Sequence, residues 1–127
     1  MGDSYTFHKD EKLSHKVTID AIFQKKGASI FKSPVLFVFL KKDLQSPYPC
    51  QLLVSVGKRK FKKAVDRNRI KRQITEIYRK QKHRIYAQIP NGTQYAIGIL
   101  FLGKEMPDYA LLENKLTAAI DEFIKKV

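Results

Sequence analysis

Apolar residues recur at helical spacing in three parts of the chain. A helix is predicted from Lys12 to about Lys26, and Gly27 offers a stop for it. A longer helix is predicted from Ala64 to about Arg84, and a last one follows the helix start at Pro107-Asp108. Each of the two later helices carries one apolar stripe, so each is expected to pack on a core. The stripes are Ile70, Ile74, Ile77, Tyr78, Gln81 and Ile85 in the longer helix, and Tyr109, Leu112, Leu116, Ala119, Ile120 and Phe123 in the last one.

Three runs rich in β-branched and aromatic residues predict strands. The first spans Val35 to Leu40 and the second Gln51 to Val56, and the Ser46-Pro47-Tyr48-Pro49 turn between them favours antiparallel pairing. The third, Gln94 to Leu102, follows a turn at Pro90-Asn91-Gly92. The order helix, strand, strand, helix, strand, helix predicts an α+β fold, a small and mainly antiparallel sheet packed with helices. The long helix predicts a strand-helix-strand crossover, and the pattern leaves open whether the strands that it joins are neighbours.

Length and composition favour one domain. A chain of 127 residues with 43% apolar content can bury one modest core, so residues 1–127 are expected to form a single domain. No apolar run approaches the ~20 residues that a membrane span needs, and no secretion signal is recognised. Cys50 is the only cysteine, which excludes an internal disulfide. The protein is therefore expected to be cytoplasmic and free of membranes.

The charge is strongly positive and unevenly distributed. Lys and Arg total 25 against 12 Asp and Glu, and the formal net charge of +13 favours a polyanionic partner. Residues 58–84 hold 13 of the 25 basic side chains and only two acids, Asp66 and Glu76. A solvated helix would interleave the two signs at i,i+4 spacing, so a nucleic-acid surface is favoured. The basic residues are Lys58, Arg59, Lys60, Lys62, Lys63, Arg67, Arg69, Lys71, Arg72, Arg79, Lys80, Lys82 and Arg84.

The start of the 64–84 helix is the best candidate for phosphate binding. The run Arg67-Asn68-Arg69-Ile70-Lys71-Arg72 stands at or just inside this start, after the basic loop 57–63. Helix N-termini and arginine forks both bind phosphate. The Asn68 amide both donates and accepts, so it could also read a 2′-hydroxyl or a base edge. The alternative role for Asp66 or Asn68 is to cap the helix.

No catalytic constellation is recognised in the chain itself. A protein-only nuclease needs converging carboxylates or a histidine pair. The acids are scattered, and Asp121 and Glu122 are best interpreted as part of a solvated helix face. His8, His15 and His83 show no metal-ligand spacing. The sequence therefore predicts neither a catalytic residue nor a metal site in this chain.

The residues around the Arg-Asn-Arg run resemble a known family. Val65 to Arg72, preceded by Ser55 to Arg59, resembles the signature of the protein subunit of bacterial ribonuclease P. The stretch Phe7 to Leu13 resembles that family's N-terminal segment, and the order of elements matches over nearly the whole chain. There are two departures from the family pattern. Lys60 to Lys63 fills a loop that commonly carries a glycine, and Ile19 stands where the family often has an aromatic residue.

The resemblance implies a division of labour between protein and RNA. In this family the large RNA subunit is the catalyst, and it uses Mg²⁺, held mainly by the RNA, to remove the 5′ leader from precursor tRNA. The protein assists, and it is expected to be monomeric outside the complex. Its basic region lies against the ribonuclease P RNA, while a concave face of the sheet and first helix receives the single-stranded leader. The family also implies that the crossover is left-handed.

The resemblance and the charge pattern together assign site residues. The leader candidates are Phe23 and Phe37, because a base stacked on an aromatic ring gains ~1–3 kcal/mol. Phe37 and Phe39 share one face of their strand, and the alternative for both rings is a place in the core. The residues expected to bind RNA are Lys58, Arg59, Lys60, Lys62, Lys63, Arg67, Asn68, Arg69, Lys71 and Arg72.

Two other binding classes compete with this interpretation. A ribosomal or assembly RNA-binding protein without a nuclease role fits the size, charge and fold equally well, and only the Arg-Asn-Arg context separates the two. A DNA-binding module would place the 64–84 helix in a major groove. That helix commits its apolar stripe to a core and lacks a helix-turn partner, so this class ranks last.

Overall fold

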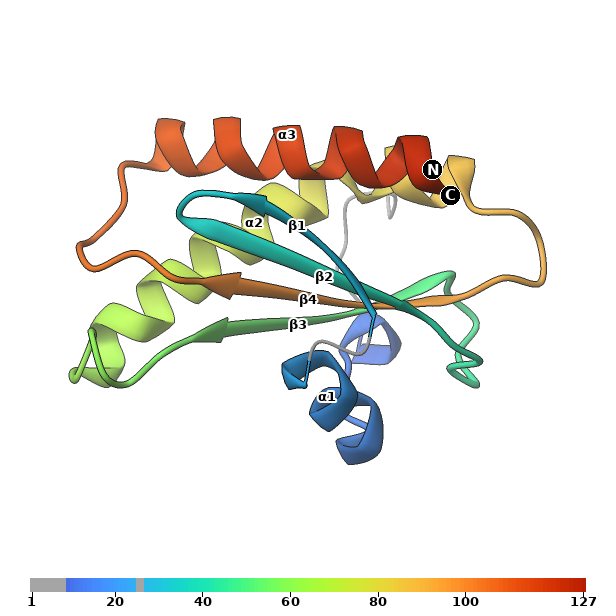
Figure 1. The fold of residues 1–127 in the computed structure, drawn as a ribbon, viewed down its shortest axis with the longest axis horizontal. Helices are drawn as coiled ribbons and strands as arrows, with labels where there is room; N and C mark the ends of the chain where they lie inside the picture. The colour runs from blue at the N-terminus through green and yellow to red at the C-terminus, as the bar shows by residue number, and fades with distance from the viewer. Residues whose placement is uncertain (1–8, 25–26) are drawn as a thin grey trace.

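The computed structural model describes residues 9–24 and 27–127, so the predictions for Phe7 and His8 lie outside the described residues (Figure 1). Helices cover both faces of a four-stranded mixed sheet, and the predicted α+β class is confirmed. The elements are a short 3-10 helix η2 (Lys9–Glu11), α1 (Lys16–Phe23), β1 (Ala28–Lys32), β2 (Val35–Lys41), β3 (Cys50–Val56), α2 (Ala64–Gln88), β4 (Tyr95–Phe101) and α3 (Tyr109–Lys126).

The strand order in the sheet is β1-β2-β4-β3. The β1/β2 and β2/β4 pairs are antiparallel and the β3/β4 pair is parallel, so the sheet is mainly antiparallel as predicted. The predicted pairing of β2 with β3 is wrong, because β4 lies between them. Most side chains of β2 and β4 are buried on both faces, which suits central strands, whereas β1 and β3 alternate more and lie at the edges. The sequence prediction also missed β1.

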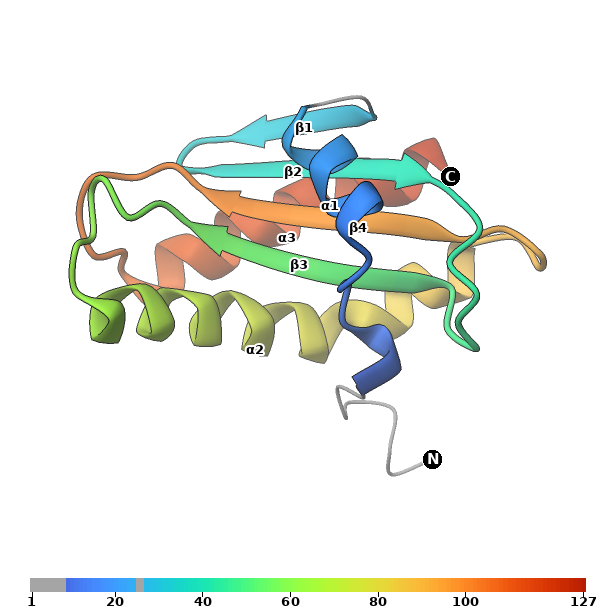
Figure 2. The same cartoon turned by 90° about the horizontal axis from the view of Figure 1, so that it is seen from below.

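The β3-α2-β4 connection is a crossover between parallel neighbours. In Figure 2, β3 and β4 point the same way while α2 returns on the far side of the sheet, and the chain turns through this unit in the left-handed sense. Such crossovers are right-handed in nearly all folds. The predicted left-handed crossover is therefore confirmed as an unusual feature of this fold.

One face of the sheet is covered by α2 and α3, and the main core lies between these layers (Figure 1). The α3 side chain Phe123 contacts three rings of the sheet, with centroid distances of 5.3 Å to Phe37, 4.8 Å to Phe39 and 5.4 Å to Tyr95. The predicted stripes of the two helices are confirmed, with Gln81 partly buried and the α2 isoleucines fully buried.

In the part of the chain that the structure describes, α1 is the helix on the opposite face of the sheet, and it is shorter than predicted. Ile22 packs there against a second, smaller cluster that includes Leu13, Leu36, Val38 and Ala96. Gly98 of β4 permits this approach, because a Cβ at that position would clash with the side chain of Ile22. Since α1 has only eight residues, part of this face remains exposed.

A buried ion pair joins η2 to α2. Lys82 is only 3% exposed, and its ammonium lies 2.7 Å from each carboxylate oxygen of Glu11. The hydroxyl of Tyr86 also donates to Glu11, and burial together with this bond raises the pKa of Tyr86. Lys82, one of the clustered basic residues of the sequence, therefore lies inside the fold and not on its basic surface. No helix in the described ranges is long and apolar enough to cross a membrane.

Candidate nucleic-acid interface

The loop between β3 and α2 is anchored by one apolar residue. Phe61 is buried, and its ring centroid lies 5.9 Å from that of Phe101 at the end of β4. The basic side chains on both sides of Phe61 are exposed. They are Lys58, Arg59, Lys60, Lys62 and Lys63, all of which were predicted to bind RNA.

Arg67 fixes this loop against the first turns of α2. Its Nη1 donates to the backbone carbonyl oxygens of Phe61, at 2.7 Å, and Lys62, at 3.0 Å. Its side chain is half-buried, and further N–H groups of the guanidinium lie outside these two bonds. Arg67 therefore shapes the basic loop in addition to adding charge to it.

The first two turns of α2 present the remaining predicted residues. Asn68, Arg69 and Arg72 are exposed, and Lys71 is half-buried. The residue at the N-cap is Lys63, without a side-chain capping bond, so the capping roles considered for Asp66 and Asn68 are wrong. Asp66 lies in the first turn, where a negative charge suits the helix dipole. The Asn68 amide projects from the same surface as the cations.

Cations of the loop and first turns lack acidic partners within the part of the chain that the structure describes. None of the nine basic residues from Lys58 to Arg72 forms a salt bridge there, and we call these nine residues the open cationic surface. They are Lys58, Arg59, Lys60, Lys62, Lys63, Arg67, Arg69, Lys71 and Arg72. Like charges at this density favour a bound polyanion.

The basic side chains in the C-terminal half of α2 are paired with carboxylates. Arg79 lies 2.6 Å from Glu76 and Lys80 lies 3.6 Å from the same carboxylate. Arg84 pairs with Asp121 of α3. Asp121 and Glu122 were interpreted as part of a solvated helix face, and both side chains remain partly exposed. Each also ties α3 to another element, because Asp121 pairs with Arg84 of α2 and Glu122 bonds Lys32 of β1 at 2.6 Å.

A row of side chains crosses the α1 face of the sheet. The register pairs Phe31 with Leu36, Leu36 with Leu100, and Leu100 with Ser55, and directly paired residues point to the same face. Leu36 and Leu100 belong to the apolar cluster beneath α1, which places the whole row on this face. The row lies near the arrowheads of β1, β3 and β4, to the left of α1 in Figure 2.

A cavity of about 310 Å³ connects this face to the basic loop. Phe23, the last residue of α1, lines it together with Ser55 and Leu100 of the row and Lys60 of the loop. The Phe23 side chain is 47% exposed, so its ring is accessible to a ligand in this cavity. The predicted leader residue Phe23 thus lies beside the open cationic surface.

The other predicted leader residue, Phe37, does not reach this face. Its side chain is 0% exposed and packs on Phe123 of α3, so the prediction that it stacks on a leader base is wrong. Strand alternation places Phe37 and Phe39 on the covered face, and the core alternative holds for both. Sequence reasoning missed Phe31, the exposed aromatic ring of β1, because the strand that carries it was not recognised.

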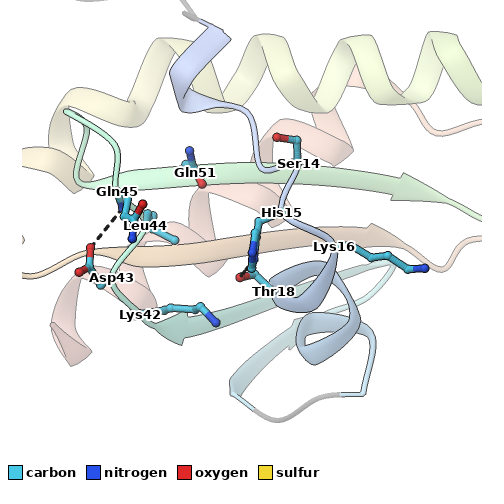
Figure 3. A pocket seen from close by; sticks show the side chains of 9 residues that line it. All are labelled: Ser14, His15, Lys16, Thr18, Lys42, Asp43, Leu44, Gln45 and Gln51. Atoms are coloured by element: carbon cyan, nitrogen blue, oxygen red, sulfur yellow. Dashed lines mark hydrogen bonds between the residues drawn. The ribbon is translucent and has the colours of Figure 1, made fainter.

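A second, larger cavity lies at the N-terminal end of α1 and measures about 560 Å³. Figure 3 shows it between the first residues of α1 and the chain that follows β2, with Gln51 of β3 beside it. Lys16 and Lys42 line it, but their ammonium groups lie apart from each other in Figure 3. Its remaining lining is polar or neutral apart from Asp43, so it is less suited to a polyanion than the cationic surface.

Residues 9–24 and 27–127 offer no cluster of three or more His, Cys, Asp or Glu side chains that could hold a metal ion. Cys50 is buried, and burial raises the pKa of its thiol, so it favours the neutral form. The open cationic surface offers ionic contacts, and the exposed ring of Phe23 offers a stacking contact.

Fold and site together define a class of protein: a small α+β protein with a left-handed crossover, whose open cationic surface adjoins an accessible sheet face. Comparison with known proteins identifies the family within this class. A family model described as Ribonuclease P matches residues 7–123. The chain therefore belongs to the ribonuclease P protein family, as the Arg-Asn-Arg context predicted.

Individual relatives agree with this assignment. The ribonuclease P protein component of Porphyromonas gingivalis is 29% identical over 119 residues, covering 92% of this chain and 85% of that protein. The corresponding protein of Chlorobium phaeobacteroides is 31% identical over 124 residues, covering 88% and 84%.

Two solved structures share the fold. The ribonuclease P protein of Staphylococcus aureus has a TM-score of 0.69 at 19% identity and covers 89% of this chain and 94% of its own. That of Thermotoga maritima has a TM-score of 0.65 at 24% identity and covers 92% and 97%.

Proposed function

We propose that this chain is the protein component of a ribonuclease P. It binds the catalytic RNA of that enzyme and the 5′ leader of precursor tRNA, and it assists Mg²⁺-dependent removal of the leader. The observation that carries the proposal is that the open cationic surface adjoins a sheet face with exposed aromatic side chains, in a chain of this family. The setting in which it would act is the bacterial cytoplasm, as a monomer outside the complex.

The open cationic surface is the proposed contact with the catalytic RNA. Arg69, Lys71 and Arg72 project from one end of α2 beside the basic loop, so several phosphates can be neutralised over a short stretch of RNA. Each neutralised phosphate releases counterions, which drives binding and makes the affinity depend on salt. Asn68 adds an amide that can bond a 2′-hydroxyl or a base edge.

The cavity beside Phe23 is the proposed entrance for the leader. Lys60 at its rim supplies charge for a phosphate, and the ring of Phe23 supplies a stacking surface for a base. Single strands are bound by this combination of a basic groove and aromatic platforms. A leader that leaves the RNA-bound end of the molecule would therefore pass from cations to rings within one short path.

Magnesium enters this proposal as an ion held mainly by the RNA subunit. It would supply a metal-activated water and charge stabilisation for phosphodiester hydrolysis. The side chains of this chain neutralise phosphates on RNA and leader, which lowers the repulsion that Mg²⁺ must otherwise screen. The protein is therefore expected to reduce the Mg²⁺ concentration at which the RNA cleaves.

The test is cleavage of a precursor tRNA by bacterial ribonuclease P RNA at low Mg²⁺, with and without this protein. The protein is expected to restore cleavage only when the RNA is present. The variant Arg69→Ala/Lys71→Ala/Arg72→Ala should lose most of this effect, while the matched control Arg79→Ala/Lys80→Ala should retain it.

Two results would contradict the proposal. If the protein does not stimulate cleavage but binds other structured RNA tightly, a ribosomal or assembly role replaces it. If the protein alone cleaves the precursor, catalysis lies in the chain and not in the RNA. Equal losses in the two variants would show that pairing of the cations does not define the interface.

A further inference from the structure

We infer that Phe31, on the edge strand β1, is a second stacking residue for the leader. The leader crosses the row Phe31–Leu36–Leu100–Ser55, and its bases are bound there by stacking rather than by hydrogen bonds. This inference rests on the proposed function and assigns a residue and a mode of recognition within it. α1 contributes one aromatic side chain, Phe23, and β1 contributes the exposed ring of Phe31 to the same face of the sheet.

The exposure of Phe31 lacks a structural explanation. Its side chain is 59% exposed, although large apolar side chains are ordinarily buried. It lies on an edge strand, where an exposed apolar residue favours unwanted association. Phe23 and Leu102 are exposed at the same end of this face, and grouped exposed apolar side chains mark interaction surfaces.

The register fixes the path that a bound strand would follow. Phe31 lies two strands away from Leu100, and strands are about 4.8 Å apart, so their positions differ by about 10 Å. Leu100 lines the cavity that also contains Phe23 and Lys60. About 10 Å corresponds to about three stacked nucleotides at ~3.4 Å each, so one leader can contact the basic loop, Phe23 and Phe31 in succession.

The chemistry of the row determines how a base would be bound. Phe31, Leu36 and Leu100 offer no polar side-chain atoms, and Ser55 at the far end offers one hydroxyl. The cation at the end of β1, Lys32, points to the opposite face, where it bonds Glu122. Without donors and acceptors a base edge cannot be read, so the expected preference follows stacking strength and favours purines modestly. The phosphates are held by the cations at the loop end of the path.

The experiment uses the complete enzyme reconstituted from ribonuclease P RNA and this protein, with precursor tRNAs that carry either a long or a two-nucleotide leader. Phe31→Ala is expected to weaken binding of the long-leader substrate about 5-fold or more, and to leave the short-leader substrate unchanged. Phe31→Trp should retain the affinity. Leu111→Ala, which truncates an exposed apolar residue of α3, is the matched control and should change neither substrate.

Abasic substitutions along the leader then locate the contact. One position is expected to lose affinity with the wild-type protein but show no further loss with Phe31→Ala, because the base and the ring form one interaction. Equal effects of Phe31→Ala on both substrates, or additive losses at every abasic position, would overturn the inference. A wild-type protein that fails to stimulate cleavage of either substrate would instead overturn the proposed function, so the two failures are distinguishable.

Discussion

The two halves of α2 have similar basic composition but opposite electrostatic environments. In the C-terminal half, Arg79, Lys80, Lys82 and Arg84 all face carboxylates, and one of these pairs is fully buried. In the N-terminal half and its preceding loop, the cations have no acidic partner among the described residues. Both halves pack on the core, but the charges of the second half stabilise the fold, whereas the charges of the first half remain available to a partner.

The structural half acts through contacts between elements that are distant in sequence. Glu11 brings η2 onto α2 through Lys82, and Asp121 brings α3 onto α2 through Arg84. A buried charge is costly to desolvate, and several good bonds to Glu11 offset that cost. Removing one partner should therefore affect stability far more than removing a cation of the open surface.

The largest expected effect is a loss of unfolding free energy in the variant Lys82→Met. This change leaves the Glu11 carboxylate buried without its cation, and breaking such a pair costs about 3–5 kcal/mol. Urea unfolding at neutral pH measures the loss. Lys80→Met is the control, and its exposed pair with Glu76 should contribute ~0–1 kcal/mol. An unchanged unfolding midpoint for Lys82→Met would show that the Glu11–Lys82 pair does not stabilise the fold.

The second effect is on the salt dependence of RNA binding. Arg69→Ala is expected to weaken binding to ribonuclease P RNA and to lower the slope of log affinity against log salt by about 0.7–0.9, because one phosphate contact is lost. Lys80→Ala should leave the slope unchanged. Titrations at several salt concentrations measure both. Identical slopes for wild type and Arg69→Ala would show that this side chain does not contact phosphate.

The third effect is on thermal stability in sulfate. An anion that binds only the folded protein stabilises it, by about 1.4 kcal/mol at ten times its dissociation constant. Melting temperatures in sulfate and in chloride at equal ionic strength should differ for the wild type. Arg69→Ala/Arg72→Ala should reduce the difference, and Arg79→Ala should not. A response that survives the first variant would place the anion elsewhere.

The smallest expected effect is on the pH dependence of stability that arises from the surface ion pairs of Glu76 and Glu122. A hydrogen bond from Arg79 lowers the pKa of Glu76 below 4.5, and one from Lys32 does the same for Glu122. Because the folded pKa is depressed, each pair stabilises the protein above pH 4.5, and this contribution is lost as the pH falls through the lower folded pKa. Carbon-detected NMR titration measures both groups. Arg79→Gln should return the pKa of Glu76 toward 4.5 without changing that of Glu122; an equal shift of both would contradict separate pairs.

The sequence predicted the helices better than the sheet. The apolar stripe of α2 is strictly periodic, and the helix begins at Ala64 as predicted and ends at Gln88, slightly later than expected. β1 escaped notice because its five residues carry only two large apolar side chains, Ile30 and Phe31. The position of β4 between β2 and β3 could not be predicted, because a strand's neighbours depend on contacts between distant segments.

The candidate site was predicted only in part, because local features can be recognised in the sequence and contacts between distant segments cannot. The cluster of cations and the Arg-Asn-Arg run are local features, and they indicated the family and the basic surface directly. Phe37 was assigned to the leader because alternation shows which residues share a face but not which face is covered. Only the position of α3 decides that Phe37 is buried, and only the shortness of α1 leaves Phe31 exposed on the other face.

By itself the sequence determined the α+β class, the apolar stripes of α2 and α3 and the concentration of positive charge between Lys58 and Arg84. These are properties of neighbouring residues, and short-range spacing is enough to specify them. The tertiary structure decided which of those charges are neutralised and which ring faces solvent. Glu11 lies 71 residues before Lys82, and Asp121 lies 37 residues after Arg84, so only the folded chain brings each acid to its cation.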